Sequence, residues 1–144
     1  MYKKLLVIII RLVITSCNNY QSPRNEDIIG TWKPNNGRST RIKKSPTSEM
    51  LKMSFKFNNN GTFNAYNIPN DFFEPLSPAQ ELHGRWKLSE DIDNEQSYLA
   101  LSFDNLATNC IVSGRNKKYF LECHPSNTTN FPYAVIFEKV STMP

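Results

Sequence analysis

The side chains best suited to covalent chemistry in this chain are three cysteines, Cys17, Cys110 and Cys123, and two histidines, His83 and His124. The sequence contains no nucleophile elbow, no zinc motif and no glycine loop that could cradle a phosphate, and its five glycines are few for such loops. Cys123 is followed by His124, but no second pair of ligands has the spacing of a metal site. We therefore expect a protein that is not an enzyme and that needs no metal or cofactor.

Cys17 ends a segment whose composition is typical of an export signal. The chain begins with the basic segment Met1-Tyr2-Lys3-Lys4, continues with an apolar run over residues 5–14, and reaches the cysteine through Thr15 and Ser16. A membrane-spanning helix needs about 20 apolar residues, so this run is too short for one and has the length of a signal-peptide core. The segment resembles a bacterial lipoprotein signal, in which the cysteine is acylated and becomes the first residue after cleavage.

This resemblance divides the chain into a signal peptide over residues 1–16, a lipidated Cys17 with a flexible tether over residues 17–27, and a domain over residues 28–144. It also implies a location in the bacterial cell envelope, at the outer membrane and facing the periplasm or the cell surface, with palmitate or a similar acyl chain as the anchor. Arg11 lies inside the apolar run, where a charge is unfavourable. An uncleaved signal anchor and a different start of the chain are therefore the alternatives.

The charge of the chain changes when the signal is removed. The whole sequence has 17 Lys+Arg against 13 Asp+Glu and a net charge of +4. Lys3, Lys4 and Arg11 lie in the signal, so the mature chain is nearly neutral. Its overall charge therefore gives no reason to expect nucleic-acid binding. The mature chain has about 130 residues, which suffice for one domain with a hydrophobic core but not for two.

Cys110 and Cys123 form an even pair once Cys17 is assigned to lipid, and an exported compartment permits a disulfide between them. Each of the two lies in a short segment with the composition of a strand, and a short turn joins the segments. If Val112 pairs with Leu121 in the resulting hairpin, Cys110 lies directly opposite Cys123, where Cβ atoms are about 4.5–5.5 Å apart. We therefore predict a disulfide, with two buried free thiols as the alternative.

Alternation of apolar and polar side chains dominates the rest of the chain, and a period of two is typical of half-buried strands. Asn58-Asn59-Asn60-Gly61 predicts a tight hairpin turn, and Ser77-Pro78-Ala79-Gln80 predicts one short helix that Gly84 would end. Strands are expected near residues 28–34, 49–58, 61–68, 84–89, 97–104, 108–113, 118–124 and 132–140. Eight short strands in sequential order favour an all-β, antiparallel up-and-down barrel, which removes exposed sheet edges.

Three short motifs connect this pattern to a known family. Gly30-Thr31-Trp32 opens the first expected strand, Asn60-Gly61-Thr62-Phe63 forms the hairpin, and Gly84-Arg85-Trp86 repeats the Gly-x-Trp pattern. With eight antiparallel strands and a long loop after the first, they resemble the lipocalins, and more closely the short bacterial lipoproteins with lipocalin-like domains. The resemblance covers roughly residues 28–140. It implies a barrel fold more than it implies an activity.

Aromatic residues are the first candidates for contact with a ligand or a partner. Trp32 and Trp86 either anchor the core or line a cavity. Phe72, Phe73 and Leu76 lie in a loop with three prolines and are too apolar for a loop that is only solvated. This loop either plugs one end of the barrel, covers a cavity as a lid, or presents an apolar patch to a partner.

A second loop is polar and basic and contains Arg38, Arg41, Lys43 and Lys44. It is either a solvated loop or a surface for lipid phosphates or an acidic partner near the membrane. Together these features favour a lipid-anchored barrel that binds a small apolar or amphipathic ligand. The alternative is a protein-binding lipoprotein, of the inhibitor or immunity type, that neutralises or scaffolds another envelope protein.

Overall fold

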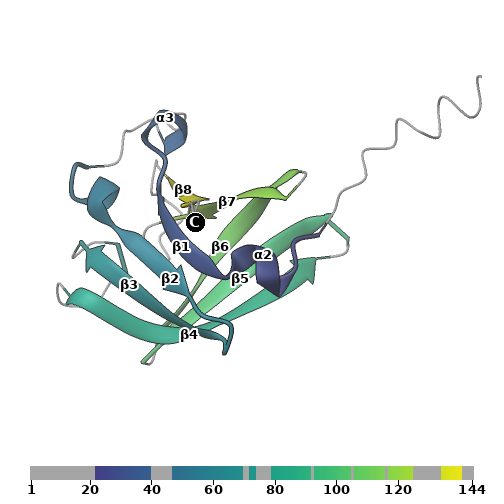
Figure 1. Ribbon diagram of the computed structural model, residues 1–144, viewed down its shortest axis with the longest axis horizontal. Helices are drawn as coiled ribbons and strands as arrows, with labels where there is room; N and C mark the ends of the chain where they lie inside the picture. The colour runs from purple at the N-terminus through teal and green to yellow at the C-terminus, as the bar shows by residue number, and fades with distance from the viewer. Residues whose placement is uncertain are drawn as a thin grey trace, which may run out of the picture.

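The computed structural model describes residues 22–39, 47–69, 72–73, 79–91, 93–104, 106–115, 117–124 and 134–140. They form eight antiparallel strands that close into one barrel, in which β8 returns to pair with β1 (Figure 1). The strands are β1 (Gly30–Pro34), β2 (Ser54–Phe57), β3 (Thr62–Ile68), β4 (Ala79–Asp91), β5 (Gln96–Phe103), β6 (Leu106–Arg115), β7 (Lys118–Cys123) and β8 (Val135–Lys139). The predicted all-β up-and-down barrel is therefore confirmed.

The helices of the described residues are short: α2 (Asn25–Ile28), α3 (Asn36–Ser39) and a 3₁₀ turn, η1 (Met50–Lys52). None of them has both the length and the hydropathy that crossing a membrane requires. The η1 turn replaces the first half of the strand expected over residues 49–58. Met50 and Met53 are both buried, and a spacing of three residues places two side chains on one face of a 3₁₀ turn, whereas in a strand they would point to opposite faces.

The helix predicted at Ser77-Pro78-Ala79-Gln80 is wrong where the structure describes it. Its last two residues begin β4, which continues past Gly84, the expected helix end; its first two lie outside the described residues. Pairing with β3 decides the outcome, because Ile68 lies opposite the first residue of β4 and Phe63 lies opposite Gly84. A single turn of helix is marginal by itself, so continuous strand pairing overrides the local cap signals.

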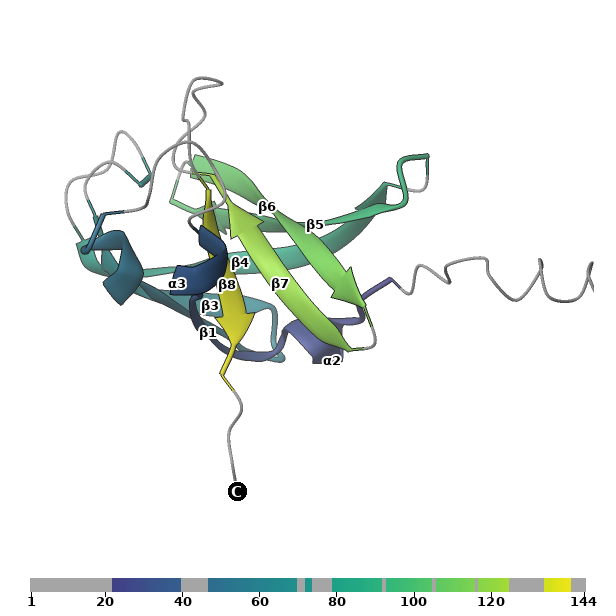
Figure 2. The same cartoon turned by 90° about the horizontal axis from the view of Figure 1, so that it is seen from above.

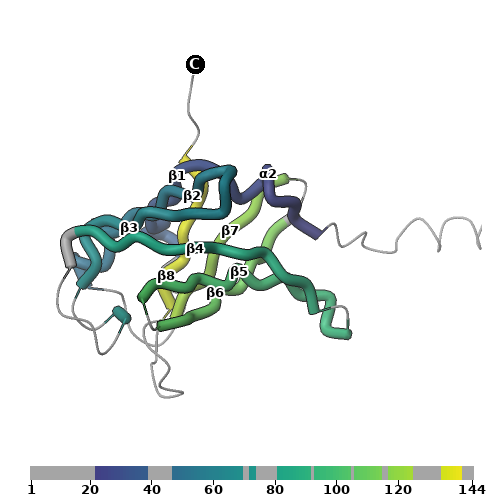
Figure 3. The backbone as a smooth tube through the Cα atoms, turned by 90° about the horizontal axis from the view of Figure 1, so that it is seen from below, coloured from purple at the N-terminus to yellow at the C-terminus, as the bar shows by residue number. Residues whose placement is uncertain are grey.

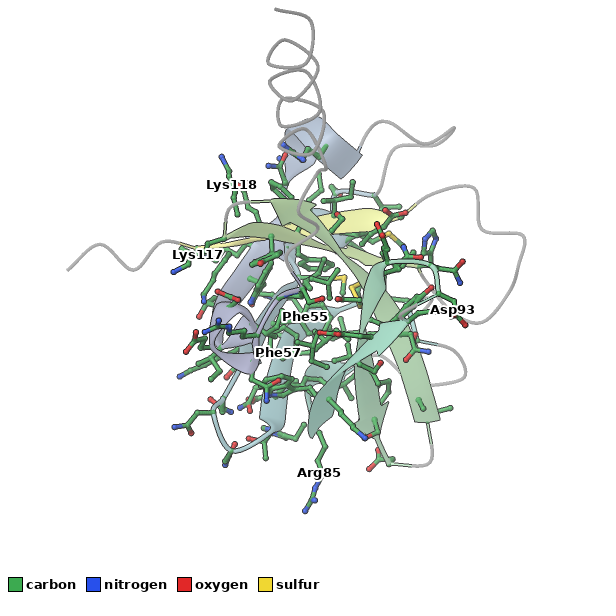
Figure 4. The ribbon with its side chains drawn as sticks, turned by 90° about the vertical axis from the view of Figure 1, so that its right-hand side faces the viewer. Phe55, Phe57, Arg85, Asp93, Lys117 and Lys118 are labelled. Atoms are coloured by element: carbon green, nitrogen blue, oxygen red, sulfur yellow. A yellow bond between two sulfur atoms is a disulfide. The ribbon has the colours of Figure 1, made fainter. Side chains whose placement is uncertain are left out.

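The interior of the barrel is filled with aromatic rings. Phe55 is central: its ring centroid lies 5.8 Å from that of Phe57, 6.2 Å from that of Phe63 and 4.9 Å from that of Phe137. All four residues are at most 2 % exposed. Figure 4 shows Phe55 and Phe57 surrounded by the wall. An eight-stranded barrel has an interior just wide enough for side chains or one small ligand, and here side chains occupy it.

The up-and-down connectivity gives the barrel two distinct ends (Figure 3). At the end where the chain leads into β1, which we call the near end, lie the connections β2–β3, β4–β5 and β6–β7. At the opposite, far end lie the connections β1–β2, β3–β4, β5–β6 and β7–β8. All the strands lie between residues 30 and 139, so a chain that begins at Asn18 contains the whole barrel.

Strands β7 and β8 separate towards the near end. They pair at four positions, and the last pair in that direction is Phe120 with Glu138. Beyond it β8 stays with β1, where Lys139 lies opposite Trp32. Helix α2 lies beside the opening between the two strands (Figure 2). The wall is therefore split locally, and the split is bordered by three separate segments of the chain.

Helix α2 is held firmly against the wall. The indole Nε1 of Trp32 donates a hydrogen bond of 2.7 Å to the carbonyl of Ile28, whose side chain is completely buried. The Nζ of Lys139 donates a hydrogen bond of 3.0 Å to the carbonyl of Asp27. The tether predicted over residues 17–27 thus ends in a helix that packs on the barrel, and the domain begins before residue 28.

Candidate functional site

Cys110 and Cys123 form the predicted disulfide. They lie opposite each other in the β6–β7 hairpin, and Val112 lies opposite Leu121, as the strand alternation predicts. Both cysteines are 1 % exposed, and the alternative of two free thiols is wrong. Because the bond is buried in the core, its role is to join two strands rather than to exchange with thiols at the surface.

Trp32 and Trp86 both donate their indole N–H to a main-chain carbonyl. Trp32 donates to Ile28 and Trp86 donates to Asn58 over 3.0 Å. Both side chains belong to the hydrophobic core, and Trp86 is 8 % exposed. This geometry supports the interpretation of both residues as packing anchors. Their contact with a ligand stays a prediction.

Phe72 and Phe73 are buried and plug the barrel from the far end. Their rings meet edge to face with centroids 4.8 Å apart. The ring of Phe73 also lies 6.5 Å from that of Phe55 and 4.9 Å from that of Phe103. The plug is therefore the arrangement that the described part of this loop adopts. Leu76 lies outside the described residues, and a role of the loop in binding stays a prediction.

The described member of the basic loop, Arg38, covers part of the outer wall. It belongs to α3, and its Cζ lies 3.8 Å from the ring centroid of Phe120, as in a cation–π contact. Phe120 is buried, yet it is not part of the core cluster. Arg41, Lys43 and Lys44 lie outside the described residues. Both predicted binding loops connect strands at the far end of the barrel, because the basic loop joins β1 to β2 and the loop with Phe72 and Phe73 joins β3 to β4.

The split between β7 and β8 forms a cleft with a volume of about 340 Å³. Its lining includes Asp27 of α2, Lys118 and Tyr119 of β7, and Glu138 and Lys139 of β8. Volumes of this size lie at the lower end of the range for small-molecule sites. Sequence reasoning missed the cleft because its residues come from three separate segments of the chain, and no local pattern marks where two paired strands separate.

The charged residues of the cleft include more lysines than carboxylates. Glu138 Oε2 accepts a hydrogen bond of 2.7 Å from Asn35 Nδ2, and Asp27 Oδ2 accepts one of 2.8 Å from the backbone N–H of Arg24. Lys117 and Lys118, at the tip of the β6–β7 hairpin, are exposed. With Lys139, the lining has three lysines against two carboxylates, so its formal charge is slightly positive and favours an anion over a cation.

The β4–β5 hairpin carries the opposite charge. Glu90, Asp93 and Glu95 are exposed at or beside its tip, and Asp91 Oδ2 accepts a hydrogen bond of 2.8 Å from Asn94 Nδ2. This bond lowers the pKa of Asp91 below its ordinary value, so Asp91 is ionised at neutral pH. Within the described part of the chain, no three His, Cys, Asp or Glu residues are grouped so that they could hold a metal ion.

Comparisons with protein-family models, with curated proteins and with solved structures found no significant match to this chain. The resemblance to lipocalin-like lipoproteins, seen in the Gly-x-Trp and Asn-Gly-Thr-Phe motifs, therefore stays a prediction. The barrel architecture is independent of it, because it follows from the strand pairing.

Proposed function

We propose that this protein is a lipoprotein of the bacterial envelope, anchored by acyl chains on Cys17, whose barrel is a rigid, non-enzymatic module that binds another envelope protein. The observation that carries the proposal is the aromatic filling of the barrel, centred on Phe55. A carrier of the lipocalin type needs room for its ligand in the interior. A barrel whose interior is occupied binds more readily through its loops and outer surface.

The far end is the surface that we assign to the partner. Strand connections with exposed polar residues gather there, among them the described parts of the two loops predicted to bind. The near end carries the chain that leads to Cys17 and faces the membrane. A module with this polarity presents its far end to other proteins of the envelope, as an inhibitor or an immunity protein would.

A paired set of bulky substitutions tests this assignment. Phe72→Ala and Phe73→Ala are poor probes, because both side chains are buried and their removal would destabilise the core by about 3–5 kcal/mol each. Ser48 is exposed at the far end and Asn59 is exposed at the near end. We expect Ser48→Trp to abolish the capture of a specific partner from envelope extracts, while Asn59→Trp leaves capture intact. Equal capture by both variants would exclude the far end.

The anchor is tested separately with Cys17→Ser. We expect this variant to lose acylation and to shift from the membrane fraction to the soluble fraction, because the acyl chains would supply most of the affinity for the bilayer. The matched control is a conservative change at a neighbouring residue, Asn18→Gln, which keeps the cysteine. A Cys17→Ser protein that remains in the membrane fraction as fully as the control would show that the anchor is assigned to the wrong residue.

A small amphipathic ligand is the second candidate, and the cleft between β7 and β8 favours it. The cleft combines lysine ammonium groups with apolar surface from Val140, which is 37 % exposed. Such a ligand would bind at the outer wall, near the membrane, rather than inside the barrel. Binding of a small ligand in the cleft would therefore leave the far end available to a protein partner.

A further inference from the structure

The cleft lies at the end of the barrel that an acyl anchor would hold at the bilayer. Four residues separate Cys17 from Ser22, the first described residue, and the five steps of an extended chain between them span at most about 18 Å. Helix α2 follows directly and contributes Asp27 to the lining of the cleft. An anchored barrel thus keeps the cleft close to the headgroups.

Two lysines of the cleft are placed to meet an anionic surface. Lys117 and Lys118 are both exposed at the β6–β7 turn, and Figure 4 shows both side chains directed away from the barrel. Lys117 has a φ of 63°, in the left-handed region that tight hairpin turns use. Lys139 adds a third positive charge, fixed at the wall by its bonds to the carbonyls of Glu26 and Asp27.

An exposed apolar side chain lies beside these lysines. Val140 is the exposed large hydrophobic residue among those that the structure describes, and it lines the cleft. Basic residues next to an apolar side chain are typical of surfaces that lie in the headgroup region of a membrane. The lysines and Val140 are therefore both suited to contact with the headgroup region of a membrane.

The acidic hairpin explains how the barrel would be oriented. In Figure 4, Asp93 of the β4–β5 turn and the two lysines lie on opposite sides of the barrel. An anionic surface attracts the lysines of the β6–β7 hairpin and repels the acidic residues of the β4–β5 hairpin. Both interactions act within the Debye length, which is about 8 Å at physiological ionic strength. The near end would thus rest with its β6–β7 side on the bilayer and its β4–β5 side raised.

From these observations we propose that the cleft between β7 and β8 binds the phosphate of an anionic phospholipid, and that this contact sets the orientation of the barrel on the membrane. The proposal rests on the near end facing the membrane, as in the proposed function. It adds to the acyl anchor a contact with a lipid headgroup, which restricts how the barrel can rotate about its tether. It also leaves the far end directed away from the bilayer.

The test measures binding of the domain that begins at Asn18 to phosphatidylcholine vesicles with and without phosphatidylglycerol. We expect binding that requires phosphatidylglycerol, and a Lys117→Gln/Lys118→Gln variant should bind about 30-fold more weakly, at about 1 kcal/mol for each lysine. The matched control is Lys52→Gln/Arg85→Gln, which removes the same charge from exposed positions outside the cleft. We expect this control to bind within a factor of about three of the wild type.

Each other outcome overturns the proposal. Equal weakening by both double variants would mean that net charge, and not the cleft, attracts the domain. Binding of inorganic phosphate without binding to vesicles would identify a site for a soluble anion. No binding to either probe would show that the cleft holds no phosphate. Since this domain lacks Cys17, these failures are distinguishable from failure of the anchor, which the Cys17→Ser variant tests.

Discussion

Gly84 is a single residue on which the packing of the barrel wall depends. It lies opposite Phe63 on the neighbouring strand, and a Cβ at residue 84 would meet Phe63 Cε1 at 2.6 Å and would collide with the carbonyl oxygen of Ser102. The ring of Phe63 occupies the volume that a side chain would need. The glycine is thus required for close packing of a ring against a strand, which is a recognised reason for glycine inside a sheet.

We expect Gly84→Ala to destabilise the domain by about 1–3 kcal/mol, because an added methyl group in a filled core forces neighbouring atoms to shift. The free energy of unfolding in urea measures this change. Gly37→Ala is the matched control, because the nearest atom to an added Cβ there is Asn35 Oδ1 at 3.6 Å, an ordinary contact. Similar losses in the two variants would contradict the packing argument.

At the scale of elements, two features hold β7 in the barrel wall: its disulfide to β6 and its short pairing with β8. The disulfide joins β6 to β7 between residues 13 positions apart. Helix α2 lies near the other end of β7, beside the split between β7 and β8 (Figure 2). Strand β7 is therefore fixed to β6 by a covalent bond, while its other edge is paired to β8 at only four positions. The disulfide thus holds β7 at its far end, whereas Asp27 of α2 and Lys139 of β8 border the split at the near end.

Removal of the disulfide should lower the free energy of unfolding by about 3 kcal/mol, the value expected for a closed loop of this size. Cys110→Ser/Cys123→Ser in the domain that begins at Asn18 tests this in urea, against the oxidised wild type. The wild-type domain, denatured without reductant, should show no thiol that reacts with a labelling reagent. Two reactive thiols per chain would contradict the bond.

Helix α2 should loosen when the indole donor is removed. Trp32→Phe leaves the buried carbonyl of Ile28 without this partner, which costs about 1–3 kcal/mol. Hydrogen exchange should rise at the Ile29 amide, which donates to the carbonyl of Asn25 across the helix. Trp86→Phe is the control, since its bond lies elsewhere and is only partly buried. Unchanged exchange at Ile29 in Trp32→Phe would mean that α2 is held by other contacts.

At the scale of the whole molecule, the filled interior and the two distinct ends govern how the protein can act. In the proposed function, the solid barrel would act as a spacer with one end near the membrane and the other facing the envelope. The proposed recognition surfaces, which are the far-end loops and the cleft in the wall, would not require the barrel to open.

An apolar fluorescent probe should therefore find no site inside the folded wild-type domain. Phe55→Ala should create one, because removing this central ring leaves a cavity lined by apolar side chains, and such cavities bind small apolar molecules. Fluorescence titration of both proteins, with circular dichroism to confirm that each is folded, makes the comparison. Strong probe binding by the wild type that Phe55→Ala does not increase would restore the interior as a ligand site.

The order of the strands and the disulfide could be predicted from the sequence because both depend on contacts between neighbouring segments. Alternation places Val112 opposite Leu121, and the pairing of Cys110 with Cys123 follows from that register. The helix at residues 77–80 could not be predicted correctly, because its cap signals act over one turn whereas pairing with β3 extends over the strand. The cleft could not be predicted either, because it depends on where β8 leaves β7.

By itself, the sequence determined an all-β pattern and the pairing of Cys110 with Cys123, while the lipoprotein-like beginning at Cys17 stays a prediction. These properties are encoded locally, in the spacing of apolar, charged and turn-forming residues. Only the tertiary structure decided that the barrel is filled, that both predicted loops lie at the far end, and that Lys117, Lys118 and Lys139 border one cleft. Closure of the barrel brings β8 to β1 and α2 to both, and no local pattern contains that contact.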